Sequence, residues 1–369
     1  MLAIGFDSGG TRTTYATTRG GGVFDSNGAE AGSSIADARD PLAFRMAIDW
    51  IIDVIEEHSD EDEIVVWIGA AGFSAATAST IKTAFAPRIA KLAEDCDRQN
   101  RTVDVLIAND AVSLLKAPPL NGTGIVAIVG TGSVVMGTHT ACDEGVIKRG
   151  GNDWVVSDEG SGVWMTVKAI QLILADIQTR GPRDYHSALL DRLSDYIGIA
   201  DQSLADIPSS HRQLAKAEAV ARKMAESRAD LKRYFARFVY PHLFDLSSME
   251  AGKPHDPIAA EVLQRSVSVI VDEIREVSEL VASYTNDQPN LRDKLPVVIG
   301  GSIAANPLYE QRLKVLTSSE CRYVSSVSIL GDGARTMASL AWQYAESSDR
   351  DRRQVARSLD PLHPVAKLL

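Results

Sequence analysis

Three features of the sequence predict an α/β protein with two β-sheets of similar construction. An apolar strand, a turn of Gly with Ser or Thr, and a returning strand occur at 2–18 and again at 122–139. Strand and helix patterns alternate between these two hairpins, and strand patterns return at 295–302 after a helical region. Repetition of one motif along a chain indicates internal duplication, here of a mixed sheet flanked by helices.

The chain length fits two domains. At 369 residues each half can bury its own core. We place the boundary in the APPLNG loop, which gives an N-terminal domain over 1–117 and a C-terminal domain over 118–346. We expect a helical insertion at about 165–290 in the second domain, and a C-terminal segment near 347–369 that packs back on the first.

The first half alternates strands and helices. Elements are expected in the order strand, strand, helix, strand, helix and strand at residues 2–7, 12–18, 41–57, 63–72, 75–95 and 103–110. The periodicity of the first helix predicts one apolar face. That face comprises Leu42, Met46, Trp50, Ile51, Val54 and Ile55.

The second half is richer in helix. Helices are expected at 161–178, 214–245, 257–285, 307–317 and 331–346, and strands at 122–139, 295–302 and 322–329. The strands return only after the long helical stretch, which is why we treat that stretch as an insertion into a sheet domain.

Composition excludes several classes of partner. The net charge of −11 argues against general binding to nucleic acid or anionic membranes, since both need basic surface. No apolar run reaches the roughly 18 residues of a membrane-spanning helix. The three cysteines, Cys96, Cys142 and Cys321, lie far apart, and no secretion signal is visible, so we predict a cytoplasmic protein with reduced thiols.

The two glycine turns are candidate phosphate cradles. The first strand ends at Asp7 and the later one at Gly130. Glycine permits close approach of the backbone, and successive N–H groups in such a turn can point at one anion. Ordinary β-turns use the same residue types, so the pattern of either turn alone leaves both interpretations open. Neither turn fits the common phosphate-loop or dinucleotide-loop motif.

Three further stretches carry polar groups at the ends of predicted elements. Asn109-Asp110 ends a buried strand, where Asp110 can cap a helix or accept a hydroxyl proton in a cleft. The glycine-, carboxylate- and tryptophan-rich stretch 150–164 can be a capped helix start or a binding loop for a polyhydroxylated ligand. The glycines that end 297–302 form a turn against which a flat base can lie.

Taken together, these motifs resemble the sugar kinase, actin and heat-shock ATPase superfamily. In detail the chain resembles the BadF/BadG/BcrA/BcrD-type ATPases, and among them the N-acetylglucosamine kinases. The motifs are DSGGTRT (7–13), AND (108–110), VGTGS (129–133), SDEGSG (157–162) and VIGGS (298–302). The resemblance implies two actin-like, ribonuclease H-like domains with ATP in the cleft between them.

The resemblance also implies roles for individual residues. Asp7 would hold Mg²⁺ through water, and Asp110 would be the catalytic base. ATP phosphates would lie against Ser8, Gly9, Gly10, Thr11, Arg12, Thr13, Thr131, Gly132 and Ser133, and adenosine against Gly300, Gly301 and Ser302. The sugar would contact Gly72, Asn109, Asp110, Gly151, Trp154, Asp158 and Glu159. The implied reaction transfers the γ-phosphate of ATP to O6 of N-acetylglucosamine, in a homodimeric enzyme.

Two departures from the family pattern leave the sugar open. The loop AGSSIADARD (31–40) lacks the Asn that these kinases usually place beside the sugar. Asn152 and Asp153 intervene where a Trp commonly follows the glycines, and Trp154 comes later. Glucosamine, N-acetylmannosamine or another hexose therefore remains an alternative substrate.

Other functional classes share this superfamily. An ATPase activator of a 2-hydroxyacyl-CoA dehydratase would need cysteines for an iron–sulfur cluster, and Cys142 and Cys321 form no obvious pair. A sugar-sensing regulator would carry an added DNA-binding module, for which the first strand, starting at residue 2, leaves no room at the front. A chaperone-like or filament-forming ATPase would lack the DEGSG loop.

Overall fold

The structure is a computed structural model. It describes residues 1–10, 12–20, 23–31, 35, 41–58, 60–140, 145–152, 157–182, 185–199, 205–226, 236–248, 255–284, 294–348, 352 and 365–369.

The first sheet has six strands in the order β11-β5-β4-β1-β2-β3. Their bounds are β1 Leu2–Ser8, β2 Arg12–Gly20, β3 Val23–Ala31, β4 Glu63–Ala70, β5 Thr102–Asn109 and β11 Ala366–Lys367. Strands β1, β4 and β5 are parallel, whereas β2 and β3 continue the sheet as an antiparallel meander. Strand β11, near the end of the described chain, pairs antiparallel with β5.

The second sheet has five strands in the order β10-β9-β6-β7-β8. Their bounds are β6 Gly124–Val129, β7 Ser133–Thr138, β8 Ile147–Gly150, β9 Leu295–Gly300 and β10 Val324–Ile329. Strands β6, β9 and β10 are parallel, and β7 and β8 form the antiparallel side. Five strands of each sheet therefore follow one topology, which confirms the predicted duplication.

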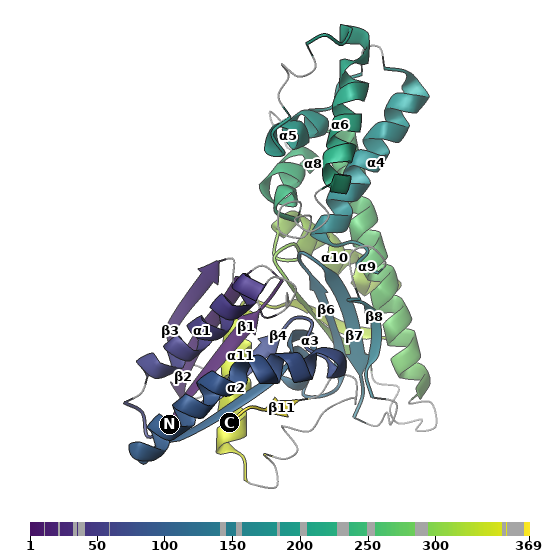
Figure 1. Cartoon of the computed structure of the whole chain (residues 1–369). Helices are drawn as coiled ribbons and strands as arrows, with labels where there is room; N and C mark the ends of the chain where they lie inside the picture. The colour runs from purple at the N-terminus through teal and green to yellow at the C-terminus, as the bar shows by residue number, and fades with distance from the viewer. Residues whose placement is uncertain are drawn as a thin grey trace.

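Helices flank both sheets (Figure 1). Those of the first half are α1 Pro41–Glu57, α2 Ala75–Arg98 and α3 Asp110–Lys116. The second half contains α4 Gly162–Arg180, α5 Ala188–Tyr196, η2 Ser209–His211, α6 Arg212–Glu226, η3 Val239–Leu243, α8 Phe244–Ser247, α9 Pro257–Tyr284, α10 Pro307–Glu320 and α11 Gly333–Glu346. Helices α4, α5, α6 and α8 gather into a projection beyond the second sheet (Figure 1).

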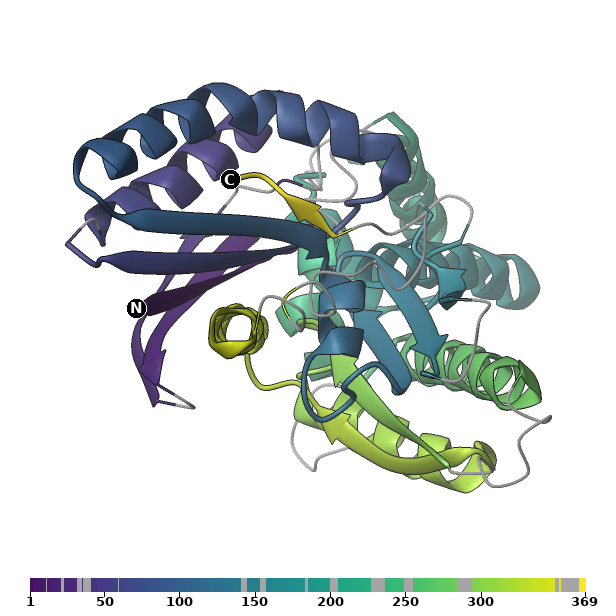
Figure 2. The same cartoon turned by 90° about the horizontal axis from the view of Figure 1, so that it is seen from below.

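The three larger apolar cores among the described residues arrange these elements in layers. One core joins α1 and α2 to the outer face of the first sheet, and another joins α4, α9 and α10 to the outer face of the second. A third contains residues of both sheets together with α3 and α11. Figure 2 shows α11 end-on beneath the first sheet, although it follows a strand of the second sheet. The division at residues 117 and 118 stays a prediction.

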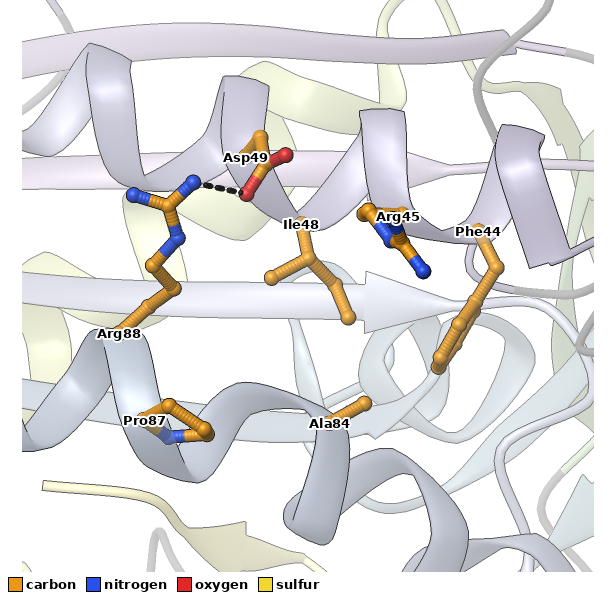
Figure 3. Close-up of a pocket in the computed structure, with 7 residues that line it drawn as sticks. All are labelled: Phe44, Arg45, Ile48, Asp49, Ala84, Pro87 and Arg88. Atoms are coloured by element: carbon orange, nitrogen blue, oxygen red, sulfur yellow. Dashed lines mark ion pairs between the residues drawn. The ribbon is translucent and has the colours of Figure 1, made fainter.

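The predicted apolar face of α1 is partly wrong. Leu42 and Met46 are 69% and 42% exposed, whereas Ile48 and Ile52 are buried. The helix has the predicted bounds, but α2 packs beside it, so the buried stripe is rotated relative to the predicted one. A pocket of about 410 Å³ remains between α1 and α2 (Figure 3), where Arg88 Nη2 and Asp49 Oδ1 pair at 2.7 Å.

Candidate functional site

The first glycine turn is braced by its own hydroxyl groups. Ser8 Oγ and Thr13 Oγ1 are hydrogen-bonded at 3.0 Å, and the backbone N–H of Ile35 donates to Ser8 Oγ at 3.0 Å. Both hydroxyl side chains are fully buried. The turn therefore presents Gly10 and Arg12 to solvent instead of Ser8 and Thr13. Thr11 lies outside the described residues.

The second glycine turn is anchored to the start of α4. Gly130 N–H donates to the carbonyl oxygen of Gly132 at 2.9 Å, and Gly162 N–H donates to that of Gly130 at 2.9 Å. Ser133 Oγ donates to the carbonyl oxygen of Glu159 at 2.7 Å. The hydroxyl of Ser133 is thus committed to fixing the 157–162 segment against the turn.

The structure brings the three predicted nucleotide turns together. A Cβ placed on Gly10 would lie 3.6 Å from Thr131 Cβ, so the two predicted phosphate turns face each other. A Cβ placed on Gly130 would lie 3.9 Å from the N and Oγ atoms of Ser302. Gly301, in the same turn, has φ +99°, a conformation that favours glycine. Exposed backbone from three turns therefore meets at one place.

Asp7 lies at this place because β1, β4 and β5 are parallel. Parallel strands end at one edge of their sheet, so Asp7, near the end of β1, and Asp110, directly after β5, lie at the same edge on either side of β4. Burial, followed by the nearby charges of Asp110 and Asp332, raises the pKa of Asp7 to about 7, while Arg12 opposes the shift. Gly333, at the first turn of α11, lies so close to the Asp7 carboxylate that a Cβ would overlap Oδ2.

Asp110 opens α3, directly after the strand. Asn109 is the N-cap of that helix, since its Oδ1 accepts from Val112 N–H at 3.3 Å. Asp110 therefore does not serve as the cap. Burial raises its pKa to about 6, although the Ala111 N–H, which donates to Asp110 Oδ1 at 2.8 Å, and the charge of Lys148 lower it. Such a carboxylate can take a proton near neutral pH.

The predicted sugar loop reaches the same place from the second sheet. A Cβ on Gly132 would lie 2.5 Å from Asp158 Oδ2, so the buried Asp158 adjoins the second phosphate turn. Gly151 has φ +68°, and its N–H donates to Ser133 O at 2.8 Å. Glu159 is exposed. Trp154 lies outside the described residues.

Gly72 belongs to the turn that follows β4. Its φ is +74°, and its carbonyl oxygen accepts from Thr77 Oγ1 at 2.9 Å. The preceding residue, Ala71, donates its N–H to the carbonyl oxygen of Ser8 at 2.9 Å. Gly72 therefore lies at the same edge of the first sheet as Ser8. No described contact joins Gly72 to Asp158.

Sequence reasoning missed three residues at this site: Lys148, Asp332 and Gly333. Lys148 Nζ donates to Gly151 O at 3.0 Å and to Asn152 Oδ1 at 3.2 Å. Burial lowers the pKa of Lys148, whereas Asp158 and Asp110 raise it, so its ammonium group faces both carboxylates. The sequence signal for Asp332 and Gly333 is a fourth glycine turn, Gly331-Asp332-Gly333, which follows the strand β10. No sequence motif surrounds Lys148, so the sequence alone gave no reason to place it in the site.

The carboxylates fit a magnesium ion that completes its shell with water and phosphate. Within the described ranges, no three His, Cys, Asp or Glu side chains form a ready metal cage. Mg²⁺ usually keeps several waters and takes one or two protein carboxylates. Burial is the main cause of the raised pKa of Asp7, with the nearby charges of Asp110 and Asp332 second, and a divalent cation beside this carboxyl group would favour its ionised form.

No described helix is long and apolar enough to cross a membrane. No curated protein matches the chain significantly.

Two solved structures share the fold at low identity. A candidate N-acetylglucosamine kinase from Chromobacterium violaceum has a TM-score of 0.50 and 17% identity, over 92% of this chain and 98% of that one. A second, from Porphyromonas gingivalis, has a TM-score of 0.52 and 16% identity, over 91% and 97% of the two chains. The predicted pair of actin-like domains is confirmed as the fold. The model of the BadF/BadG/BcrA/BcrD ATPase family matches residues 4–334, nearly the whole chain. The chain belongs to the BadF/BadG/BcrA/BcrD ATPase family.

Proposed function

We propose that this protein is an ATP-dependent kinase that transfers the γ-phosphate to a hydroxyl of an amino sugar, N-acetylglucosamine at O6. The observation that carries the proposal is the meeting of the Gly10 and Thr131 turns beside two carboxylates, Asp7 and Asp110. An ATPase that transfers the phosphate to water would also need the two turns that hold the nucleotide, so the turns alone do not distinguish it from a kinase. An acceptor site built from Asp110, Lys148 and Asp158 supports transfer to a hydroxyl compound instead.

The nucleotide would be held mainly by backbone. Gly9, Gly10, Arg12, Thr131 and Gly132 would contact the phosphates, and Ser8, Thr13 and Ser133 would shape the turns from within. The turn at Gly300, Gly301 and Ser302 would receive the adenosine. Mg²⁺, held by Asp7 with Asp332 nearby, would offset phosphate charge. Backbone N–H groups fixed before the reaction stabilise developing charge without reorganisation.

Asp110 would be the catalytic base. Phosphoryl transfer depends on positioning and charge stabilisation, and the base orients the attacking hydroxyl and takes its proton. Asn109 would help place the sugar while it caps α3. Gly72, Gly151, Trp154, Asp158 and Glu159 would complete the sugar site.

The deciding experiment is Mg-ATP-dependent ADP release against a panel of sugars. We expect N-acetylglucosamine to stimulate release at least tenfold over the rate without sugar. The panel also contains glucosamine, N-acetylmannosamine, N-acetylmuramic acid and glucose. Preference for one of those sugars would keep the kinase and change its substrate. ATP hydrolysis independent of every sugar would contradict the proposal and favour an ATPase coupled to a partner protein. The homodimer and the cytoplasmic location stay predictions.

Gly10→Val tests the phosphate cradle. The side chain would fill the space next to Thr131, where a Cβ already comes within 3.6 Å. We expect Mg-ATP affinity to fall at least tenfold, about 1.4 kcal/mol, with little change in melting temperature, because Gly10 is exposed. Gly20→Val is the matched control, because nothing lies within 4 Å of its Cβ position. Unchanged nucleotide affinity for Gly10→Val would remove the cradle.

A further inference from the structure

One face of α9 supports the candidate sugar loop. Ser266 Oγ donates to Gly160 O at 2.6 Å, and a Cβ on Gly160 would lie 2.9 Å from Ile270 Cγ1. Farther along the helix, Val277 packs against Gly137 of β7. Residues three, four and seven apart share a helix face, so Glu273 lies between these contacts, on the side that faces β7, β8 and the loop.

Glu273 is an unexplained carboxyl group. Its Oε2 is buried and has no hydrogen-bond partner among the described residues. A buried polar atom without a partner costs roughly 1–3 kcal/mol, so such an atom in a native structure needs a reason. Neither the proposed phosphoryl transfer nor the packing of α9 uses this side chain.

Negative charge surrounds this carboxyl group. Glu159 and Asp158 face it from the loop and Glu276 from its own helix, while Arg149 of β8 supplies the opposing charge. Arg149 Nε donates to Glu276 Oε2 at 3.0 Å, so the positive charge of Arg149 is shared between Glu276 and Glu273. Burial, followed by the neighbouring carboxylates, raises the pKa of Glu273 to about 8. From α10, Tyr309, a neutral phenol hydrogen-bonded to Ser266 at 2.9 Å, also faces it.

We propose that Glu273 is a positioning residue of the candidate sugar site and acts through the Asp158–Glu159 segment. The inference rests on the proposed kinase function. At neutral pH the side chain carries a proton, so the segment lies over a neutral group. Loss of that proton adds a negative charge beneath Asp158 and Glu159, which repels the segment from its place against Gly132. Sugar affinity, and not the chemical step, should depend on this proton.

The test is the pH dependence of KM for the sugar. In the wild type we expect KM to rise above about pH 8, roughly tenfold by pH 9, with kcat changed less than threefold. Lys148, whose pKa burial lowers, also loses its proton at alkaline pH, so the wild-type profile alone does not decide. Glu273→Gln keeps the shape without the ionisation and should remove most of the rise in KM between pH 8 and pH 9, and any remainder would belong to Lys148. The exposed Glu279→Gln, on the same helix, should keep the wild-type rise.

Two outcomes would overturn the inference. In one, the KM of Glu273→Gln still rises at alkaline pH as in the wild type. In the other, kcat changes with pH while KM does not. A measurement without sugar separates this inference from the kinase proposal. The unfolded carboxyl loses its proton near pH 4.5 and the folded one near 8, so native stability should fall across that window. Glu273→Gln should remove that part of the fall at pH 9, even if no sugar in the panel is a substrate. If the variant does not fold, a flat KM in the wild type still contradicts the inference.

Discussion

Asp110→Asn should lower kcat by about 10²- to 10⁴-fold, the usual contribution of a positioned general base. The amide has the shape of the carboxylate but cannot accept the proton of the attacking hydroxyl. Binding should survive, because the Gly10 and Thr131 turns do not involve this side chain. We therefore expect KM values for ATP and sugar within about threefold of the wild type. Steady-state kinetics on the panel-selected sugar measure both quantities.

The pH dependence of the wild type adds a second check. The pKa of Asp110 is about 6, so the base is lost as the pH falls through 6, and kcat should decline about tenfold per unit below that. The exposed Asp53→Asn serves as the control and should leave the profile unchanged. Turnover of Asp110→Asn within a few-fold of the wild type would show that Asp110 is not the base.

Stability should move in the opposite direction to activity. The folded carboxyl holds its proton to about pH 6, against 3.8 for the unfolded group, so ionisation of Asp110 destabilises the fold as the pH rises across this window. At 1.36 kcal/mol per unit, Asp110→Asn should gain on the order of 1–3 kcal/mol at pH 7. At pH 4 the gain should disappear. Thermal melting at both values measures it.

Gly333→Ala should impair Mg-ATP use strongly, although alanine is the better helix former by about 1 kcal/mol. The new Cβ would occupy the position of the Asp7 carboxylate, and the backbone of α11 cannot yield without disturbing its packing on the first sheet. Asp7 would have to turn away. We expect the Mg²⁺ concentration for half-maximal activity to rise at least tenfold, or about 1.4 kcal/mol.

Gly331→Ala is the matched control for this effect. It lies two residues earlier, and nothing lies within 4 Å of its Cβ position. Activity and Mg²⁺ dependence should stay within about twofold of the wild type. Equal behaviour of the two alanine variants would mean that Asp7 does not hold the cation in the position described.

The sequence by itself predicted the central strands of both sheets and the turns that end them, but not the strands β3, β8 and β11. Short apolar runs that end in Gly with Asp, Ser or Thr are local patterns, and each predicted a strand and the turn after it. Because β1 and β5 both run parallel to β4, which lies between them, Asp7 and Asp110 lie at the same edge of the sheet. The repeat of one hairpin predicted the topology that both sheets share.

Only the tertiary structure decided which elements distant in the sequence pack against each other. Periodicity along α1 could not show that Leu42 stays exposed, because the neighbouring helix α2 sets the buried stripe. The crossing of α11 to the first sheet, which brings Gly333 to Asp7, leaves no trace in local sequence. The same holds for Lys148 beside Asp158 and for Glu273 beneath the loop. Local pattern specifies which face of an element is apolar, whereas contacts between distant elements depend on how all the layers pack together.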